Sequence, residues 1–69
     1  MDLYDVKTLK EWLDRIGSLP SYQRDLIDEA IFAIENNLLE RARRALTTMA
    51  RNYRNDRNDN AAHAVERLL

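Results

Sequence analysis

Four arginines are the residues in this chain whose charge and spacing most clearly suggest a function. They share one face of a predicted helix, with Thr47 and Thr48 between them, and are Arg43, Arg44, Arg51 and Arg54. Guanidinium groups bind phosphates and carboxylates through paired hydrogen bonds. The face could therefore contact an acidic protein surface or a nucleic-acid backbone. The alternative is a solvated face that forms weak ion pairs with acids of the preceding helix.

Phe32 is a second candidate for a partner contact. On a helical wheel it lies about 100° from the nearest edge of the apolar arc, among Asp25, Asp28 and Glu35. An exposed aromatic ring is typical of an interface anchor. The alternative is that another helix of the same chain covers it. Tyr53, with a polar hydroxyl at the rim of the predicted core, completes the predicted partner-binding set.

The residue types that support catalysis or metal binding are sparse. The chain has no cysteine and a single histidine, His63, which excludes thiolate sites and histidine clusters. Ser18 and Ser21 are better interpreted as helix caps than as nucleophiles, because no base is predicted beside them. The carboxylates of residues 25–29 have helical spacing, but nothing indicates a cleft around them. We expect no enzymatic activity, no metal and no cofactor.

The composition predicts one helical domain that spans residues 1–69. One glycine and one proline in a chain that is 45% hydrophobic favour helices with few tight turns. A chain of this length buries only about 60% of its unfolded surface, so its core is marginal and a partner would stabilise it. The start is acidic and the longest apolar run is Ala30 to Ile34. We therefore expect a soluble, cytoplasmic protein without membrane contact.

Charge is distributed unevenly although the net charge is only −1. Residues 1–37 hold four basic and eight acidic side chains, whereas residues 38–69 hold seven arginines and four acids. An acidic half and a basic half can face each other within one chain or across a dimer.

Hydrophobic spacing predicts an all-α fold with three main helices and a short C-terminal one. The main helices are expected over residues 5–16, 22–35 and 38–53, and the short one after residue 60. Asn36 and Asn37 favour an antiparallel hairpin between the second and third helices, because asparagine tolerates the left-handed conformation. The alternative is one continuous helix to Tyr53, which would be unusual without a coiled-coil partner.

The helix ends are predicted from cap and turn residues. Asp5 is expected to cap the first helix and Gly17 to end it. Ser18 or Ser21 should cap the second, and the sequence does not decide between them. Residues 52–60 could be a loop or a fraying helical end. Asp59 or Asn60 is expected to cap the last helix.

Residues 21–39 are the stretch around which we expect the chain to be organised. Their apolar side chains fill an arc of about 180°, whereas a single packing partner needs only about 100°. The width indicates two neighbours, or one neighbour and a second copy of the chain. We predict a homodimer, because this arc and the amphipathic first helix exceed what so short a chain can bury. The residues predicted for the core or the dimer contact are Trp12, Ile27, Ile31, Ile34 and Leu38.

Residues 37–46, NLLERARRAL, resemble the hairpin turn and second helix of a tetratricopeptide repeat. Ala30 and Ala33 fall roughly where such a repeat has small residues. The repeat's glycines, its closing proline and a second copy are absent, so the resemblance implies hairpin geometry and not a repeat function. In size and lack of motifs the chain also resembles the small helical proteins by which phages and plasmids inhibit host regulators.

The leading hypothesis is a non-enzymatic protein that binds a larger protein and inhibits or modulates it, as an inhibitor, anti-activator or adaptor. The partner would have an acidic surface that meets the arginine face. The alternative is a small nucleic-acid-binding regulator that uses the same arginines, although a pI near 5.7 disfavours it. A third possibility is a structural subunit of a larger assembly.

Overall fold

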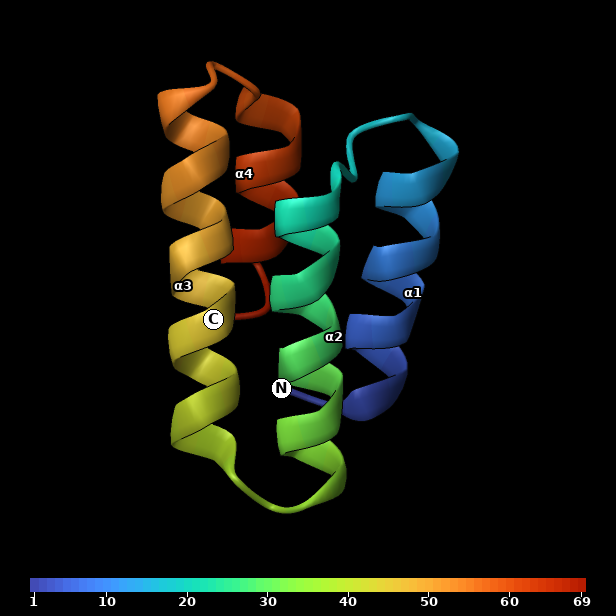
Figure 1. Cartoon of the computed structure of the whole chain (residues 1–69), viewed down its shortest axis with the longest axis vertical. Coiled ribbons are helices and arrows are strands. Elements are labelled where there is room, and N and C mark those ends of the chain that lie inside the picture. The colour runs from blue at the N-terminus through green and yellow to red at the C-terminus, as the bar shows by residue number, and fades with distance from the viewer.

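The chain folds as four α-helices in the computed structural model, which describes residues 1–69. The helices are α1 (Leu3–Arg15), α2 (Ser21–Glu35), α3 (Leu39–Asn55) and α4 (Asp59–Glu66). Each helix runs antiparallel to the one before it (Figure 1). The all-α prediction, with the second and third helices as an antiparallel hairpin, is confirmed. The alternative of one continuous helix is wrong, because α2 ends before the asparagine pair.

All three turns between helices share one hydrogen-bond pattern. Gly17, Asn37 and Arg57 adopt left-handed conformations, with φ of 72°, 59° and 58°. The next amide in each turn donates to the carbonyl five residues earlier, and these bonds are Ser18 to Leu13 (2.9 Å), Leu38 to Ala33 (2.7 Å) and Asn58 to Tyr53 (2.8 Å). This is the Schellman motif, which ends a helix and satisfies its last carbonyls. The same helix-terminating motif therefore occurs at regular intervals along the chain.

The first helix begins earlier than the sequence suggested. Asp2 caps α1, since its carboxylate Oδ1 accepts a hydrogen bond from the Tyr4 amide at 2.9 Å. The prediction that Asp5 is the cap is therefore wrong. Asp5 lies inside the first turn, where its negative charge still complements the helix dipole.

No serine caps the second helix. Pro20 occupies the cap position of α2, with extended backbone and no side-chain cap bond. Its carbonyl accepts from the Arg24 amide at 2.9 Å, which makes Ser21 the first helical residue. The predicted caps Ser18 and Ser21 are both wrong, because proline's fixed φ already sets the entry into the helix.

The segment 52–60 is mostly helical. It contains the last turn of α3, a turn centred on Arg57 and the start of α4. Asn58 caps α4 by accepting a hydrogen bond from the Ala61 amide at 3.4 Å. The predicted caps Asp59 and Asn60 instead lie inside the first turn of α4.

The core is rich in alanine. It contains 16 buried apolar residues, of which seven are alanines. Six of the 16 come from α3 and are Ala42, Ala45, Leu46, Met49, Ala50 and Tyr53. The three alanines in this set allow α2 and α4 to approach α3 closely, and these are the two helices that pack most extensively on it.

The wide apolar arc of α2 is covered from within the chain. Ile27 is fully buried, and Ile31 and Ile34 are half-buried against the core. α2 packs mainly on α3 and also on α1. Both of the neighbours that the arc required are therefore helices of this chain, and a second copy is not needed to explain its width.

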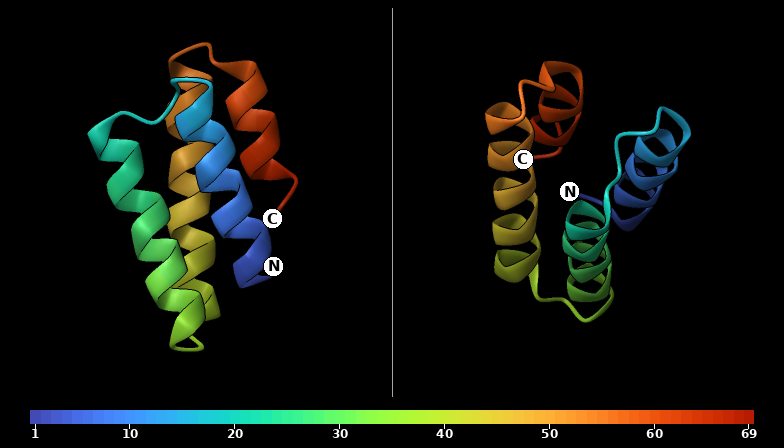
Figure 2. Two further views of the ribbon diagram at one scale, coloured as in Figure 1. Left: turned by 90° about the vertical axis from the view of Figure 1, so that its right-hand side faces the viewer. Right: turned by 45° about the horizontal axis from the view of Figure 1, so that its top comes forward.

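α1 and α4 are the pair of packed helices with the least contact between them. They stand apart on the same side of the α2–α3 pair (Figure 2). The radius of gyration of 10.6 Å matches the value of about 11 Å expected for a compact chain of this length. None of the four helices is both long enough and apolar enough to span a membrane.

Candidate functional site

Three large apolar side chains are exposed where α2 turns into α3. Phe32, Leu38 and Leu39, which we call the hairpin tip, are 51%, 43% and 54% exposed. α4 has only eight residues, whereas α3 has 17. Because α4 folds back from the far end of α3, it is too short to reach the tip (Figure 1). Leu38 and Leu39 therefore stay uncovered at this end, whereas Phe32 is exposed because it lies on the face of α2 opposite to its buried residues.

Phe32 is held in place by an arginine of α3. The Arg41 guanidinium carbon lies 5.7 Å from the centroid of the Phe32 ring, within the range of a cation–π contact. Arg41 also donates from Nε to Glu29 Oε1 at 3.0 Å. This arrangement fixes the orientation of the ring while half of the side chain stays exposed. The geometry suits the predicted role of Phe32 as an anchor.

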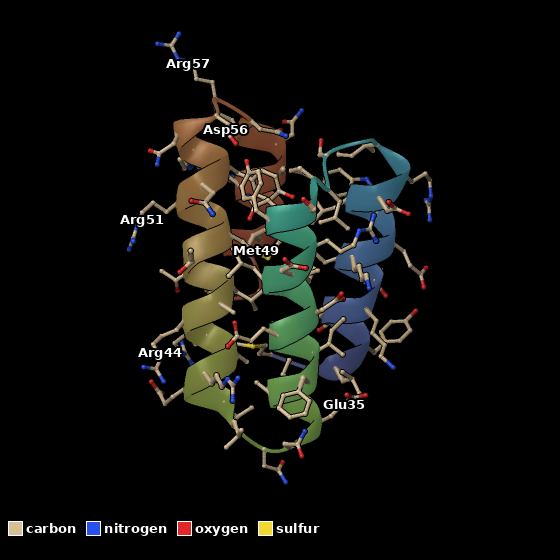
Figure 3. All side chains as sticks on the ribbon, in the orientation of Figure 1. Glu35, Arg44, Met49, Arg51, Asp56 and Arg57 are labelled. Atoms are coloured by element: carbon tan, nitrogen blue, oxygen red, sulfur yellow. The ribbon has the colours of Figure 1, made fainter.

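Arginines line the outer edge of α3 and continue into the α3–α4 turn. The side chains of Arg44, Arg51 and Arg57 project away from the bundle, and we call them the arginine row (Figure 3). All three are exposed and none forms an ion pair. The helical rise separates Arg44 from Arg51 by about 10 Å along the axis. Arg43 is also exposed and unpaired, but it lies about 100° round the helix from Arg44.

A shallow hollow connects the hairpin tip with the arginine row. Its lining residues are Asn37, Leu38, Leu39, Glu40, Arg41 and Arg44. The tip and the first arginine of the row therefore form one continuous surface. The sequence predicted Phe32, Arg44 and Arg51 but missed Leu39 and Arg57, since an exposed leucine and a turn arginine carry no distinctive signal.

Arg54 is not part of this free surface. Its Nη2 and Nε donate to the two carboxylate oxygens of Glu66 at 2.6 and 3.1 Å, and its Nη1 donates to Asp59 at 3.3 Å. The hydrogen bond with Arg54 lowers the pKa of Glu66 and raises that of Arg54. Arg54 therefore fastens α4 to α3, in contrast to its predicted role as a partner contact.

Tyr53 is also an internal residue. Its side chain is 2% exposed, and its hydroxyl donates to the Ser18 carbonyl at 2.6 Å. Burial raises the pKa of Tyr53 to about 12. The partner-binding role predicted for Tyr53 conflicts with this position, because the α1–α2 turn packs on the face of α3 that carries the ring.

A polar cluster joins two turns at the end of the molecule opposite the hairpin tip. The Tyr22 hydroxyl donates to Asp56 Oδ2 at 2.6 Å, which raises the pKa of Tyr22. Asn58 Nδ2 donates to Ser18 Oγ at 3.1 Å. These bonds connect the α1–α2 turn to the α3–α4 turn. Sequence reasoning missed the cluster, because its members are more than 30 residues apart in the chain.

Gln23 is the one buried polar residue. Its amide Nε2 donates to the Met49 carbonyl at 3.2 Å, whereas its Oε1 has no hydrogen-bond partner. The position gave no signal in the sequence, because a single glutamine fits the polar face of an amphipathic helix equally well.

The residues predicted for the core or the dimer contact separate into two groups. Trp12, Ile31 and Ile34 are half-buried against the core and Ile27 is fully buried. Leu38 is instead 43% exposed at the hairpin tip. It follows the left-handed Asn37 directly, so its side chain lies at the end of the bundle.

The acidic and basic halves of the chain largely fail to pair with each other. Lys10–Asp28 and Arg24–Asp14 lie within the first half, at 2.6 and 2.8 Å. Arg41–Glu29 is the only ion pair that joins the two halves. This leaves the arginine row without an acidic partner in the chain. No group of three or more potential metal ligands comes together.

No family model, no curated protein and no solved structure matches this chain. The continuous surface formed by the hairpin tip and the arginine row is therefore the feature of this chain that points most clearly to a function.

Proposed function

We propose that this chain is a non-enzymatic interaction protein that binds a larger protein and inhibits or modulates it. The proposal rests on one observation: Leu38 and Leu39, exposed at the hairpin tip beside Phe32, share a hollow with Arg44, an arginine without an ion-pair partner. Contiguous exposed apolar side chains beside a free cation are typical of a protein interface. We further propose a cytoplasmic location, which a composition without cysteine fits.

The proposed mechanism is occlusion of a surface on the partner. Phe32, Leu38 and Leu39 would enter an apolar recess and supply most of the affinity. The arginine row would pair with acidic groups at the rim of the recess, which mainly sets orientation and association rate. The short four-helix bundle would then block access of other molecules to the recess.

The test is affinity capture from a lysate of the organism that encodes the chain, followed by mass spectrometry. Arg44→Glu combined with Arg51→Glu should abolish capture and leave the melting temperature nearly unchanged, because both side chains are exposed and unpaired. Lys7→Glu combined with Arg15→Glu on α1 makes the same change in charge and should capture normally. Capture that survives the α3 substitutions would show that the arginine row is not the site.

A nucleic-acid-binding regulator is a second candidate, favoured by the unpaired arginine row. Its spacing of about 10 Å along α3 would allow separate phosphate contacts. A gel shift with unrelated duplexes at low and moderate salt separates the candidates. Salt-sensitive retardation that is lost in the α3 double variant would support nucleic-acid binding, and no shift at micromolar protein would remove it.

We also propose that the chain forms a homodimer in the absence of its partner, through the hairpin tip. The support is the exposure of Leu38 and Leu39 rather than the width of α2. Sedimentation equilibrium should show a dimer that Leu39→Ser converts to monomer. A monomer for the wild-type chain at millimolar concentration would contradict this proposal and leave the partner-binding proposal intact.

A further inference from the structure

α1 and α4 stand apart on the same side of the α2–α3 pair (Figure 2). The side chains between these two helices line a groove. Its volume is about 520 Å³, within the usual range for small-molecule sites. Leu9, Trp12 and Ala64 are its buried or half-buried lining residues. Thr8, Asn60, His63 and Arg67 are exposed and form its polar rim. The groove thus offers an apolar floor with an aromatic ring and several hydrogen-bonding groups.

The charge of the groove has one sign. None of its seven lining residues is acidic, and Arg67 forms no ion pair or side-chain hydrogen bond within the chain. Glu66, the nearest acid in sequence, is engaged with Arg54 on the α3 side. Glu11 of α1 lines a different groove, the one beside α2. An unpaired guanidinium above an apolar floor suits an anion that carries a flat apolar body.

From this arrangement we infer that the α1–α4 groove binds a small planar aromatic carboxylate. The ring of the ligand packs against Trp12 and Leu9, and its carboxylate pairs with Arg67, with Asn60 and Thr8 as further donors. The site is separate from the hairpin tip and does not depend on the proposed interaction function. A bound ligand would also bridge the two helices that contact each other least.

To test this inference, 1-naphthoate is titrated into the full chain, and the amide and indole N–H signals of the protein are followed by two-dimensional NMR. Trp12 is the only tryptophan, so the single indole N–H cross-peak reports on the groove without further assignment. We expect this peak to shift saturably. The neutral analogue 1-naphthylmethanol should bind about tenfold more weakly, the order of magnitude of one charge-assisted hydrogen bond.

Two matched variants locate the charge effect. Arg67→Gln should remove the preference for the carboxylate without unfolding the chain, because Arg67 is exposed and unpaired. Arg44→Gln, the same change on the distant arginine row, should retain it. Equal binding of the two ligands to the wild-type chain, or an unchanged preference in Arg67→Gln, would overturn the proposal. So would the absence of a saturable shift at millimolar naphthoate.

Discussion

The Tyr53 hydroxyl couples the stability of this protein to alkaline pH. Burial raises its folded-state pKa from 10.0 to about 12, so the folded chain retains a proton that the unfolded chain has lost in this range. The stabilisation is complete below pH 10 and is lost as pH rises through about 12. By linkage, the free energy of unfolding should fall on the order of 2 kcal/mol across this window.

Urea unfolding between pH 9 and 11.5 tests this prediction against Tyr53→Phe. The variant should be about 1 kcal/mol less stable at pH 9, because it loses the hydrogen bond to Ser18. The variant should also lack the part of the fall in unfolding free energy at alkaline pH that comes from ionisation of Tyr53. All other ionisable groups are the same in both proteins, so the difference between the two curves isolates Tyr53. Parallel curves would mean that the hydroxyl is solvated.

Gln23 is a second residue whose environment predicts an unusual response. Its unpaired buried Oε1 is a cost that methionine, of similar shape, would remove. We expect Gln23→Met to raise the free energy of unfolding by about 1 kcal/mol, seen as a melting temperature roughly 5 °C higher. Gln23→Ala, which leaves a cavity, should lower it. A clear destabilisation by methionine would indicate that an ordered water satisfies the amide.

Among the secondary-structure elements, the three Schellman turns share one hydrogen-bond pattern but place different residue types in the left-handed conformation. Arg57 bears a steric cost of about 1 kcal/mol that Gly17 avoids. Arg57→Gly should therefore stabilise the chain by up to about 1 kcal/mol, and Gly17→Ala should destabilise it by a similar amount. A Cβ at position 17 meets no atom within 4 Å, so backbone strain alone would be measured. Denaturant unfolding of both variants measures these changes. Unchanged stability in both variants would contradict the prediction.

The same turns show which features of the fold a sequence can reveal. Glycine and asparagine at positions 17 and 37 predicted two of the turns because these residue types favour the left-handed conformation. Arginine has no such preference, so the third turn was placed only somewhere within residues 52–60, and neither its centre at Arg57 nor the end of α3 at Asn55 was predicted. The first helix was placed late because Asp2 and Asp5 are equally good caps on composition, and only the backbone decides between them.

For the whole molecule, the order and length of the helices determine which surfaces stay open. α4 is too short to reach the hairpin tip, and it stands apart from α1. The sequence predicted the exposure of Phe32, Arg44 and Arg51 in the candidate site, because the face on which each residue lies depends on one helix alone. It assigned Tyr53 and Arg54 to a partner contact, whereas both form contacts within the chain. The sequence could not show this, because tertiary packing decides which face of α3 meets α4 and the α1–α2 turn.

The central claim is that the hairpin tip contacts a larger protein, and site-specific photocrosslinking tests it most directly. Benzoylphenylalanine would replace Leu39 at the tip or, as a matched control, Tyr4 on α1, which is 74% exposed. In lysate of the encoding organism, the tip probe should form one adduct of much higher mass and the α1 probe none. Adducts from both positions, or from the α1 position alone, would contradict the account.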